Sequence, residues 1–523
     1  MLPVLAQAAL PPAPNAWVVQ NMQNTIVDGS KGTYLSKIVG FLRYCEEKCP
    51  AMLCPSFLAD AVRDSSGAVS RKYVKFALYT SFPPKPILDH NKFETRIVHD
   101  WMSTLKGKKS KKQDGPNMAS NSSYNGARSA FRQLFTRYSK PLPSDYERDT
   151  AGLLAGVKRT IAKAKQDGDV SMVEGKAAMS FLLYCMIAKE FLRNGDVFSH
   201  LFLLCSWNLM CRASNTDGIR LQHLEWQDDC LKIYFGLQKN DQDGTRNMDP
   251  RHCYANPFNP EISVVLSLGI YFLCFGVNKN RNARLFEGKN QYQRFLKALK
   301  KVMASCPEIK AEMERCGLTC EDIAAHSTRK GGRSYCAGGS TNGPAFVTIM
   351  LRGGWSLEGI DKRYVRYERA GDQYVGRILS GLNVNSVEFA FLPPFFDNAD
   401  SDVNAAISNC FPGAPVEMEL ILRFCLASVV HHQDYLRREL SAKHPLCSTT
   451  LFAGGLAKEL QPKVECRLSR AGDRLVPTGI PSHVLIMGRM EMLENQMIAL
   501  PQAVTSSLKS YFDGRDHGKL FFS

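Results

Sequence analysis

The chain has 523 residues, of which 44% are hydrophobic, and its 66 Lys and Arg against 50 Asp and Glu give a formal net charge of +16 at pH 7. The length leaves room for two to four domains, and the apolar content is ordinary for a globular protein with a real core. The longest apolar run, Ile262–Val277, has 16 residues, whereas a membrane-spanning helix needs about 20. We therefore expect a buried core helix there and no membrane partner.

The positive charge is unevenly distributed. Residues 101–170 hold 14 Lys and Arg against 6 Asp and Glu, a net charge of +8, which is half of the total. A basic surface attracts polyanions and accelerates encounter with them. Charge alone leaves a nucleic-acid partner and a generic basic protein equally open.

The 17 cysteines are scattered, mostly in apolar runs, without a paired framework. The start, MLPVLAQAALPPAPNA, lacks the basic n-region of a secretory signal peptide, so a reduced intracellular compartment fits better. Cys45, Cys49 and Cys54 are close together, but no Cys/His pair follows at zinc-finger spacing. We favour buried free thiols over a zinc site there and expect no bound metal.

Residues 1–90 form a first predicted region whose role the sequence leaves open, with a poorly defined lead of short helices over 1–60. Residues 91–170 predict a helical domain. It contains the loop KGKKSKKQDGPNMASNSS, which has no apolar periodicity. The loop's basic residues could bind phosphates, act as a nuclear localisation signal, or be simply solvated. They are Lys106, Lys108, Lys109, Lys111 and Lys112.

Two amphipathic helices follow in this domain, over Tyr124–Tyr138 and Asp149–Ala164. In each, apolar side chains share one face and basic side chains lie elsewhere. The pattern predicts a small helical domain that clamps DNA, although an ordinary pair of surface helices has the same pattern. The residues that we expect to contact DNA here are Arg128, Arg132, Lys158, Arg159 and Lys163.

Residues 171–385 predict a second domain, entered through the turn-rich linker QDGDVSMVEG. Long apolar helices run to Leu209, and helices resume from Ile262 to about Ser380. Between them LKIYFGL alternates apolar and polar residues and Asp243-Gly244 follows, which predicts a β-hairpin or small sheet. The predicted fold class is therefore mainly α with a small β-hairpin or sheet.

Residues 386–523 predict a C-terminal helical extension that is loop-rich up to about residue 415. Near its end apolar residues repeat at 4-3-4-3 spacing, an a/d seam of about two heptads before Pro501. The seam consists of Ile486, Met490, Leu493, Met497 and Leu500. Such a short seam is compatible with oligomerisation and with packing onto the chain's own body.

The stretch HSTRKGGRSY…LRGGWSLEGIDKRYVRY concentrates chemically active side chains. His326 and Arg329 stand at i and i+3, where a helix presents both on one face. Trp355 lies 26 residues past the arginine, and Tyr364 nine residues past the tryptophan. Imidazole, guanidinium and indole donors converging on one point would cradle a phosphodiester and stabilise its five-coordinate transition state. A phenol within reach could attack it, so the stretch predicts DNA strand cleavage through a protein–phosphate ester without a metal.

The ordered set of these residues resembles the tyrosine recombinases, the integrase family that shares a catalytic fold with type IB topoisomerases. Within the family it is most similar to the Crypton-type recombinases of eukaryotic transposons. The resemblance covers about residues 100–385 and implies a helical core-binding domain followed by the tyrosine recombinase catalytic fold. The family pattern is Arg after a helix, Lys in a β-hairpin, His-x-x-Arg, His or Trp, then Tyr. It is matched by Arg212, Lys239, His326, Arg329, Trp355 and Tyr364.

The resemblance also implies a role for each residue. Arg212 would help to hold the transition state, with Arg220 as the weaker candidate. The family often has a carboxylate three residues after this arginine, where Asn215 stands here, and Asp217 could substitute. Lys239 would give a proton to the leaving 5′ oxygen.

The nucleophile implied by the resemblance is Tyr364, which would form a 3′-phosphotyrosine. Tyr367, one helical turn later, is its rival. Arg363 and Arg366 flank both phenols, where they would lower a phenol's pKa and contact backbone phosphates.

The resemblance implies a site-specific DNA recombinase or transposase of a mobile element, which needs no metal and no cofactor. Four copies would act on two sites in double-stranded DNA, two copies at each site, in the nucleus. Two alternatives stay open. One is a domesticated, non-catalytic DNA-binding regulator, and the other is a type IB topoisomerase-like activity.

Overall fold

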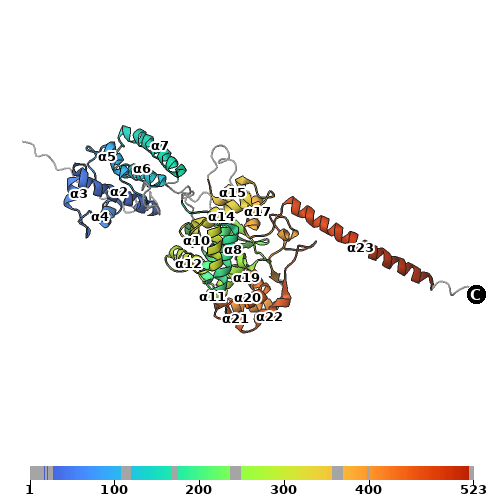
Figure 1. Cartoon of the computed structure of the whole chain (residues 1–523). Helices are drawn as coiled ribbons and strands as arrows, with labels where there is room; N and C mark the ends of the chain where they lie inside the picture. Colours follow the sequence, from blue (N-terminus) through green and yellow to red (C-terminus); the bar gives the residue numbers. More distant parts are fainter. Residues whose placement is uncertain are drawn as a thin grey trace, which may run out of the picture. The chain divides into compact units, whose positions relative to one another are not determined.

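The computed structural model describes residues 28–107, 119–167, 175–235, 249–355, 369–396 and 400–516, together with Trp17, Gln20 and Asn21. The chain divides into two compact units, Met1–Glu174 and Gly175–Ser523 (Figure 1). Among the helices of the described residues, none combines the length and the hydropathy of a membrane-spanning segment.

Unit 1 is helical in its described part, and its core is rich in aromatic rings. Phe41 lies edge-on to Trp101 and to Phe131, with ring centroids 5.5 and 4.8 Å away. The elements are α2 (Asp28–Lys48), η1 (Pro50–Met52), α3 (Pro55–Ala59), α4 (Arg71–Lys75), the π-helical turn η2 (Phe76–Thr80), α5 (Thr95–Ser103), α6 (Asn121–Arg137) and α7 (Ser144–Gln166).

The long helix α2 corrects the expectation of a lead with only short helices over residues 1–60. It has 21 residues and packs against α4, α5 and α6. Its buried side chains Leu35, Ile38, Phe41 and Leu42 recur every three or four residues, which is the spacing of one helical face. Gly29, Gly32 and Gly40 lower the helix propensity of this segment and weaken the helical signal in its sequence.

The two amphipathic helices predicted in unit 1 are confirmed as α6 and α7, each beginning earlier than expected. α6 begins where the Ser120 hydroxyl accepts a hydrogen bond from the Ser123 N–H at 3.3 Å. α7 has Asp145 in its first turn and Lys163 in its last, charges that the helix dipole favours at those ends.

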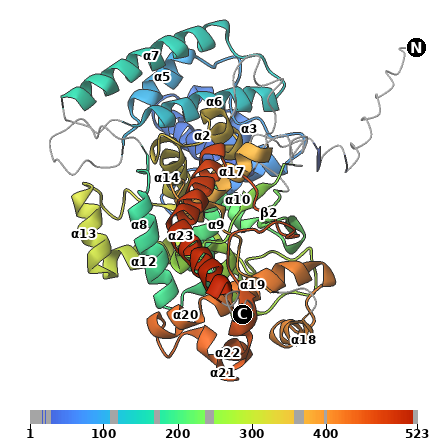
Figure 2. The same ribbon diagram turned by 90° about the vertical axis from the view of Figure 1, so that its right-hand side faces the viewer.

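The core of unit 2 is built around its helix α9 (Val197–Asn208), all of whose residues are buried. A helix that is apolar all round belongs in the middle of a core, and α9 packs against α8, α11, α12 and α14 (Figure 2). The helices that precede the candidate site residues are α8 (Phe181–Arg193), α9, α10 (Ala213–Asp217), α11 (Val264–Phe275), α12 (Gln291–Ser305), α13 (Pro307–Arg315), α14 (Ala325–Gly338) and α15 (Phe346–Gly353), with the short turns η3 (Leu221–His223) and η4 (Pro260–Ile262). α11 confirms the predicted core helix.

The rest of unit 2 is also mostly helical. Its elements are α17 (Arg369–Leu379), η5 (Val387–Ala390), β4 (Phe395–Phe396), α18 (Ser401–Cys410), η6 (Val416–Met418), α19 (Glu419–His431), α20 (Gln433–Glu439), η7 (Pro445–Ser448), α21 (Thr450–Ala453), α22 (Leu456–Leu460), η8 (Gln461–Lys463), β5 (Val464–Glu465) and α23 (Ser482–Asp516). α18 falls in a stretch that we expected to be loop-rich, and the Asp400 carboxylate caps its first turn by accepting from Val403 N–H. α19 packs on α11 and on the sheet. The C-terminal region is therefore helical, as expected, but α19 also forms part of the core of unit 2, which the sequence did not predict.

The predicted small sheet is confirmed as three antiparallel strands in the order β1-β2-β3, and its neighbour in the core is α19. The strands are β1 (Leu224–Gln227), β2 (Cys230–Ile233) and β3 (Arg251–Cys253), and β4 pairs with β5 separately. Trp226 of β1 stacks on Phe424 of α19 with ring centroids 3.9 Å apart. All four residues of β2 are buried, because both faces of the strand are covered.

A buried ion pair joins the parts of unit 2 on either side of residues 356–368. Arg352, near the end of α15, contacts the Asp372 carboxylate of α17 at 2.8 Å, and their side chains are 0% and 4% exposed. Arg352 also donates to the carbonyls of Asn208 and His252 at 2.7 and 2.9 Å. Asp372 accepts from the His252 backbone N–H at 3.0 Å and contacts Nδ1 of its ring at 2.8 Å. One ion pair thus fixes α9, β3, α15 and α17 to one another.

Removing this buried pair should destabilise the protein strongly. Asp372→Asn leaves the Arg352 guanidinium buried without its counter-charge, which costs about 3–5 kcal/mol. Urea unfolding followed by tryptophan fluorescence measures the loss. Asp228→Asn is the matched control, because it removes an exposed pair with Arg369, 2.7 Å long, and exposed pairs contribute less than about 1 kcal/mol. Equal losses in the two variants would contradict the role of the buried pair.

The same pair predicts a loss of stability in acid. Burial opposes ionisation of Asp372, but Arg352 and the His252 donors hold its pKa well below the usual range. A carboxyl whose pKa is lower in the folded state stabilises the fold fully above its unfolded pKa, about 4. We therefore expect the free energy of unfolding to fall as the pH drops below about 4, and to fall less in Asp372→Asn.

Candidate functional site

Arg212 stands where α9 ends and α10 begins. Its backbone carbonyl accepts from the N–H groups of Asn215 and Thr216, at 2.8 and 3.2 Å, so the residue occupies the N-cap of α10. The side chain is half-buried, and within the described residues it has no ion pair with a carboxylate. The end of the core helix therefore presents a guanidinium whose charge is not neutralised locally.

His326 and Arg329 lie on α14, as the His-x-x-Arg spacing predicted, with the histidine exposed and the arginine 3% exposed. α14 lies close to Trp207 of α9 and to Met179 at the position of Gly331. A Cβ there would lie 2.7 Å from the Trp207 ring and would collide with the Met179 carbonyl. This close approach to α9 brings Arg329 to the end of the helix that Arg212 follows.

The Gly-Gly-Trp turn ends α15 and folds the tryptophan back over the cluster. Gly354 has φ +63°, a left-handed conformation suited to glycine, and the Trp355 ring lies directly against Gly353, where a side chain would displace it. The Arg329 guanidinium lies 4.4 Å from the Trp355 ring centre and donates to the Gly353 carbonyl. Arg333 lies 4.9 Å from the same ring. The indole therefore lies within cation–π distance of two arginines of α14.

Arg212, Arg251 and Arg329 form what we call the arginine cluster. Burial lowers the pKa of Arg329 to about 10, and the charges of Arg212 and Arg251 act in the same direction. Arg251, at the start of β3, donates to the Leu351 carbonyl at 3.1 Å. Among the described residues, no carboxylate raises the pKa of Arg329 in return. Like charges gathered in this way form a site that an anion would stabilise.

Two residues of this arrangement, Arg251 and Arg333, were not predicted from the sequence. Arg333 stands at i+4 from Arg329, so helical spacing could have indicated it. Arg251 carries no local signal, because it reaches the site through the pairing of β3 with β2. Arg333 adds positive charge beside Trp355, and the charge of Arg251 acts on Arg329.

His326 lies at the edge of the cluster. Partial burial lowers its pKa below 6.5, and the positive charges of Arg329, Lys330 and Arg212 act in the same direction. The ring is therefore mainly neutral at pH 7 in the free protein. A neutral imidazole donates from one nitrogen and accepts at the other.

Several predicted site residues lie outside the described residues, and the structure says nothing of their positions. Lys239 is in the connection between β2 and β3, and Tyr364 and its rival Tyr367 are in the connection between Trp355 and α17. The others in this group are Lys108, Lys109, Lys111, Lys112, Arg363 and Arg366.

The two weaker alternatives near Arg212 are engaged elsewhere. Arg220 is exposed and donates to the Asn282 carbonyl. Asp217 pairs with Arg284 at 3.8 Å rather than with His326 or Arg329. Neither residue contributes to the charge environment of the cluster.

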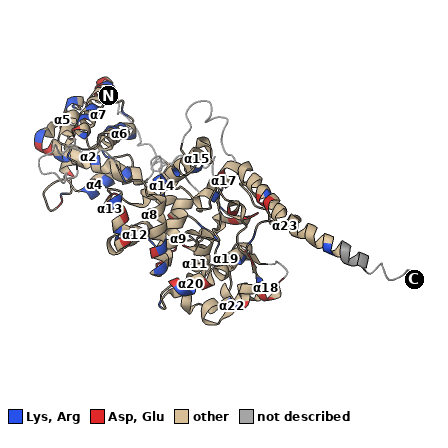
Figure 3. Cartoon of the chain, turned by 45° about the vertical axis from the view of Figure 1, so that its right-hand side comes forward, with Lys and Arg blue, Asp and Glu red and all other residues tan. Residues whose placement is uncertain are grey.

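The basic residues predicted to bind DNA in unit 1 differ in their surroundings. Arg128 and Arg132 both donate hydrogen bonds to the Glu147 carboxylate. These bonds lower the pKa of Glu147 to about 2, and the bond from Arg132 has the larger effect. Lys158, Arg159 and Lys163 are exposed along α7, part of whose ribbon Figure 3 colours blue for Lys and Arg, and Lys106 is exposed as well. The α7 residues are therefore more available to a polyanion than the two arginines of α6.

The three close cysteines of unit 1 are free. Cys45 is buried, which raises the pKa of its thiol, and Cys49 and Cys54 are half-buried. Over the described ranges, no three His, Cys, Asp or Glu side chains are grouped so as to hold a metal ion.

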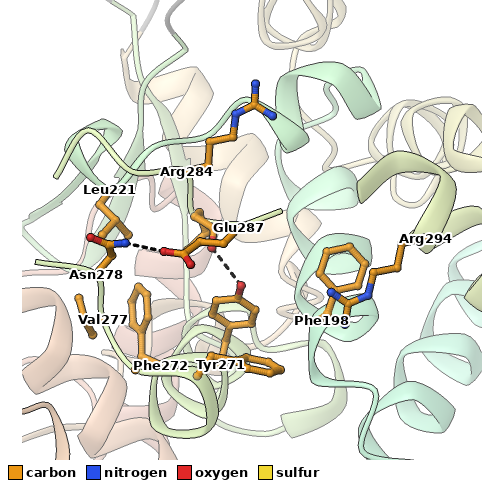
Figure 4. Close-up of a pocket in the computed structure, with 12 residues that line it drawn as sticks. Phe198, Leu221, Tyr271, Phe272, Val277, Asn278, Arg284, Glu287 and Arg294 are labelled. Carbon is orange, nitrogen blue, oxygen red and sulfur yellow. Dashed lines mark hydrogen bonds between the residues drawn. The ribbon is translucent and has the colours of Figure 1, made fainter. Parts of the chain in front are cut away.

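A separate cavity of about 400 Å³ lies between α9, α11 and the chain that follows α11 (Figure 4). Phe198, Phe272 and Tyr271 line it, and its charged groups are already engaged. Glu287 accepts from Asn278 at 2.6 Å, and Arg294 lies 4.0 Å from the Phe198 ring centre. None of the arginine cluster lines this cavity, so an anion held by the cluster would bind outside it.

The chain matches solved structures but no family model and no curated relative. The chain is similar to the protein in a Flpe–Holliday junction complex, at 13% identity over 82% of this chain and 98% of that one, with a TM-score of 0.33. It is also similar to the site-specific recombinase XerH bound to its difH substrate, at 13% identity over 64% and 92%, with a TM-score of 0.31.

The charge of Arg212 should be measurable at His326. Arg212→Gln removes one of the cations that lower the histidine pKa, so the His326 titration midpoint should move upward from its value below 6.5. Nuclear magnetic resonance of histidine-labelled protein measures the midpoint, and His326→Gln assigns the signal. Arg220→Gln is the control and should leave the midpoint unchanged. A midpoint at 6.5 or above in the wild type would contradict the cluster.

Proposed function

We propose that this chain is a tyrosine recombinase that cleaves and rejoins DNA strands through a 3′-phosphotyrosine intermediate. The observation that carries the proposal is the arginine cluster. Arg212 and Arg329 come from different helices, lie within each other's electrostatic reach and have no carboxylate partner within the described residues. A phosphodiester supplies the missing negative charge, and its non-bridging oxygens match guanidinium donors.

The described ends of the two critical connections support Lys239 and Tyr364 as further members of this site. The connection that contains Lys239 ends at Arg251, whose charge acts on Arg329. The connection that contains Tyr364 begins at Trp355, which lies on Arg329. Each connection therefore has one end at the cluster, which supports the assignment of both residues to a phosphate bound there.

The chemistry that we propose is a balanced transesterification. The Tyr364 phenol gives its proton to water and attacks phosphorus, so that a tyrosine O–P bond forms while the P–O5′ bond breaks. Lys239 gives a proton to the leaving 5′ oxygen. Arg212 and Arg329 hold the negative charge on the non-bridging oxygens, and Trp355 and Arg333 limit how the Arg329 fork can move. Attack by a 5′ hydroxyl on the phosphotyrosine reverses the steps.

The biological setting is a further part of the proposal. We propose a recombinase or transposase of a mobile element, of the Crypton type, that acts in the nucleus with four copies on two DNA sites. The ordered motif set supports the element type, and the lysine-rich run from Lys106 to Lys112 supports nuclear import. The exposed basic residues of α7 support a clamp on duplex DNA.

Covalent trapping tests the proposed chemistry. Duplexes that bind the protein are first selected from a random pool, and the selected sites are then synthesised with a nick beside each phosphate in turn. The nick releases a short 5′-hydroxyl strand after cleavage, so rejoining fails and a denaturant-resistant protein–DNA adduct accumulates. We expect an adduct with the 3′-phosphate end at one position. Uniform relaxation of supercoiled plasmid without site preference would instead favour the topoisomerase-like alternative, and binding without any adduct would favour the non-catalytic regulator.

The nucleophile can be assigned with a pair of matched variants. Tyr364→Phe should abolish the adduct while leaving DNA affinity within about twofold, because the phenol oxygen forms the covalent bond and contributes little to the salt-dependent binding. Tyr367→Phe should retain the adduct. Peptide mapping of the trapped species checks the assignment, and an adduct on Tyr367 would move the nucleophile by one helical turn.

The two arginines near the end of α9 provide a second matched pair. Arg212→Ala should lower the rate of adduct formation about 10²–10³-fold, the usual cost of losing one transition-state donor. Arg212 is half-buried and has no ion pair within the described structure, so its loss should leave the fold intact. Arg220→Ala should change the rate less than about twofold. Similar rates in Arg212→Ala and the wild type would remove Arg212 from the proposed site.

A further inference from the structure

Within the described residues, the C-terminal helix α23 packs on unit 2 near its beginning. It has 35 residues, and near its start His483 Nε2 lies 2.9 Å from the Val384 carbonyl while Val484 is 2% exposed. Every described side chain from Arg489 to Ser510 is exposed. The helix continues through Pro501 (Figure 1), beyond the point where the sequence pattern indicated the end of its seam.

The exposed part of α23 carries a continuous apolar seam. The five residues of the predicted a/d repeat are all more than half exposed, and Val504 extends the repeat at the next 4-residue step with 48% exposed. An average spacing of 3.5 residues is the repeat of a left-handed coiled coil rather than of a helix lying on a globular core. Figure 3 shows that this part of α23 has few charged residues. A surface of this kind is stabilised when a second helix covers it.

The charges beside the seam indicate which helix covers it. In the heptad set by the seam, Arg489 occupies the g position, Glu494 the following e position and Glu491 an outward-facing b position. In a parallel, in-register pair, a g residue lies against the e residue five positions later in the second helix. Arg489 would therefore face Glu494 of a second copy, and Glu494 would face Arg489 of that copy. The helix is complementary to itself in this orientation.

We propose that α23 forms a parallel, in-register, two-stranded coiled coil with α23 of a second copy of this chain, centred on residues 486–504. The contact is independent of DNA and of the proposed recombinase chemistry. Anchoring by His483 and Val484 means that the helix is already ordered in the single chain, so association does not have to order it. Leu493 and Leu500 at d with Val504 at a are residue types found in parallel dimers.

The oligomeric state of the full-length protein without DNA tests the contact. Light scattering during gel filtration should give a dimer at micromolar concentration in the wild type and a monomer in Leu493→Lys/Met497→Lys. Both side chains are exposed in the single chain, so the variant should keep the wild-type unfolding temperature. A wild type that stays monomeric at all concentrations up to the solubility limit, or a double variant that remains a dimer, would overturn the proposal.

Charge exchange tests the orientation. Arg489→Glu and Glu494→Arg should each weaken the dimer about tenfold, since each creates two like-charge pairs, and the double exchange should restore it. Glu491→Lys makes an equal change of charge at an outward position and should alter the dissociation constant less than about twofold. An antiparallel pair does not bring these two residues together, so failure of the double exchange to restore the dimer would overturn the parallel register.

Discussion

The ion pair between Arg352 and Asp372 is the interaction on which the candidate site depends. Both groups are buried, and leaving either charge without its partner would cost about 3–5 kcal/mol. Because Arg352 also binds the Asn208 and His252 carbonyls, the pair fixes the end of α9, strand β3, and the helices before and after residues 356–368. Those are the segments that carry Arg212, Arg251 and Trp355. The position of each of these residues therefore follows from one compensated pair of charges.

Arg329, at the centre of the cluster, is the opposite case, because within the described residues no carboxylate compensates its charge. Arg329 is buried beside Arg212 and Arg251, and its lowered pKa expresses the cost of burying it and of holding these like charges together. The fold meets this cost through the Gly353 carbonyl, which accepts from Arg329, and through the face of Trp355. A bound phosphodiester would relieve the repulsion, and relief is greatest when negative charge builds up in a transition state. Preorganised repulsion of this kind favours catalysis over simple binding.

Local patterns predicted those parts of the molecule that local forces determine. The helices α6, α7 and α11 and the strand β2 follow from apolar periodicity, and His326 and Arg329 share a face because of their spacing. The turn expected at Asp243-Gly244 lies outside the described residues, and the pairing of β2 with β1 came only from the structure. The helix α2 was missed because its three glycines have low helix propensity. The place of α19 in the core depends on contacts with α11 and Trp226 that are distant in sequence. Arg251 joins the site through strand pairing, so no local pattern indicates it. Arg333 stands at i+4 from Arg329, so helical spacing could have indicated it, although the family pattern contains no residue at that position.

The proposed recombinase function depends on anion binding at the arginine cluster. Anomalous diffraction from crystals soaked in tungstate tests this binding most directly. Tungstate is a heavy tetrahedral oxyanion, so its position needs no knowledge of the DNA target. We expect an anomalous peak within hydrogen-bonding distance of both Arg212 and Arg329 at low tungstate concentration. The peak should be lost in Arg212→Ala. Peaks along α7 alone, with none between those two arginines, would contradict it.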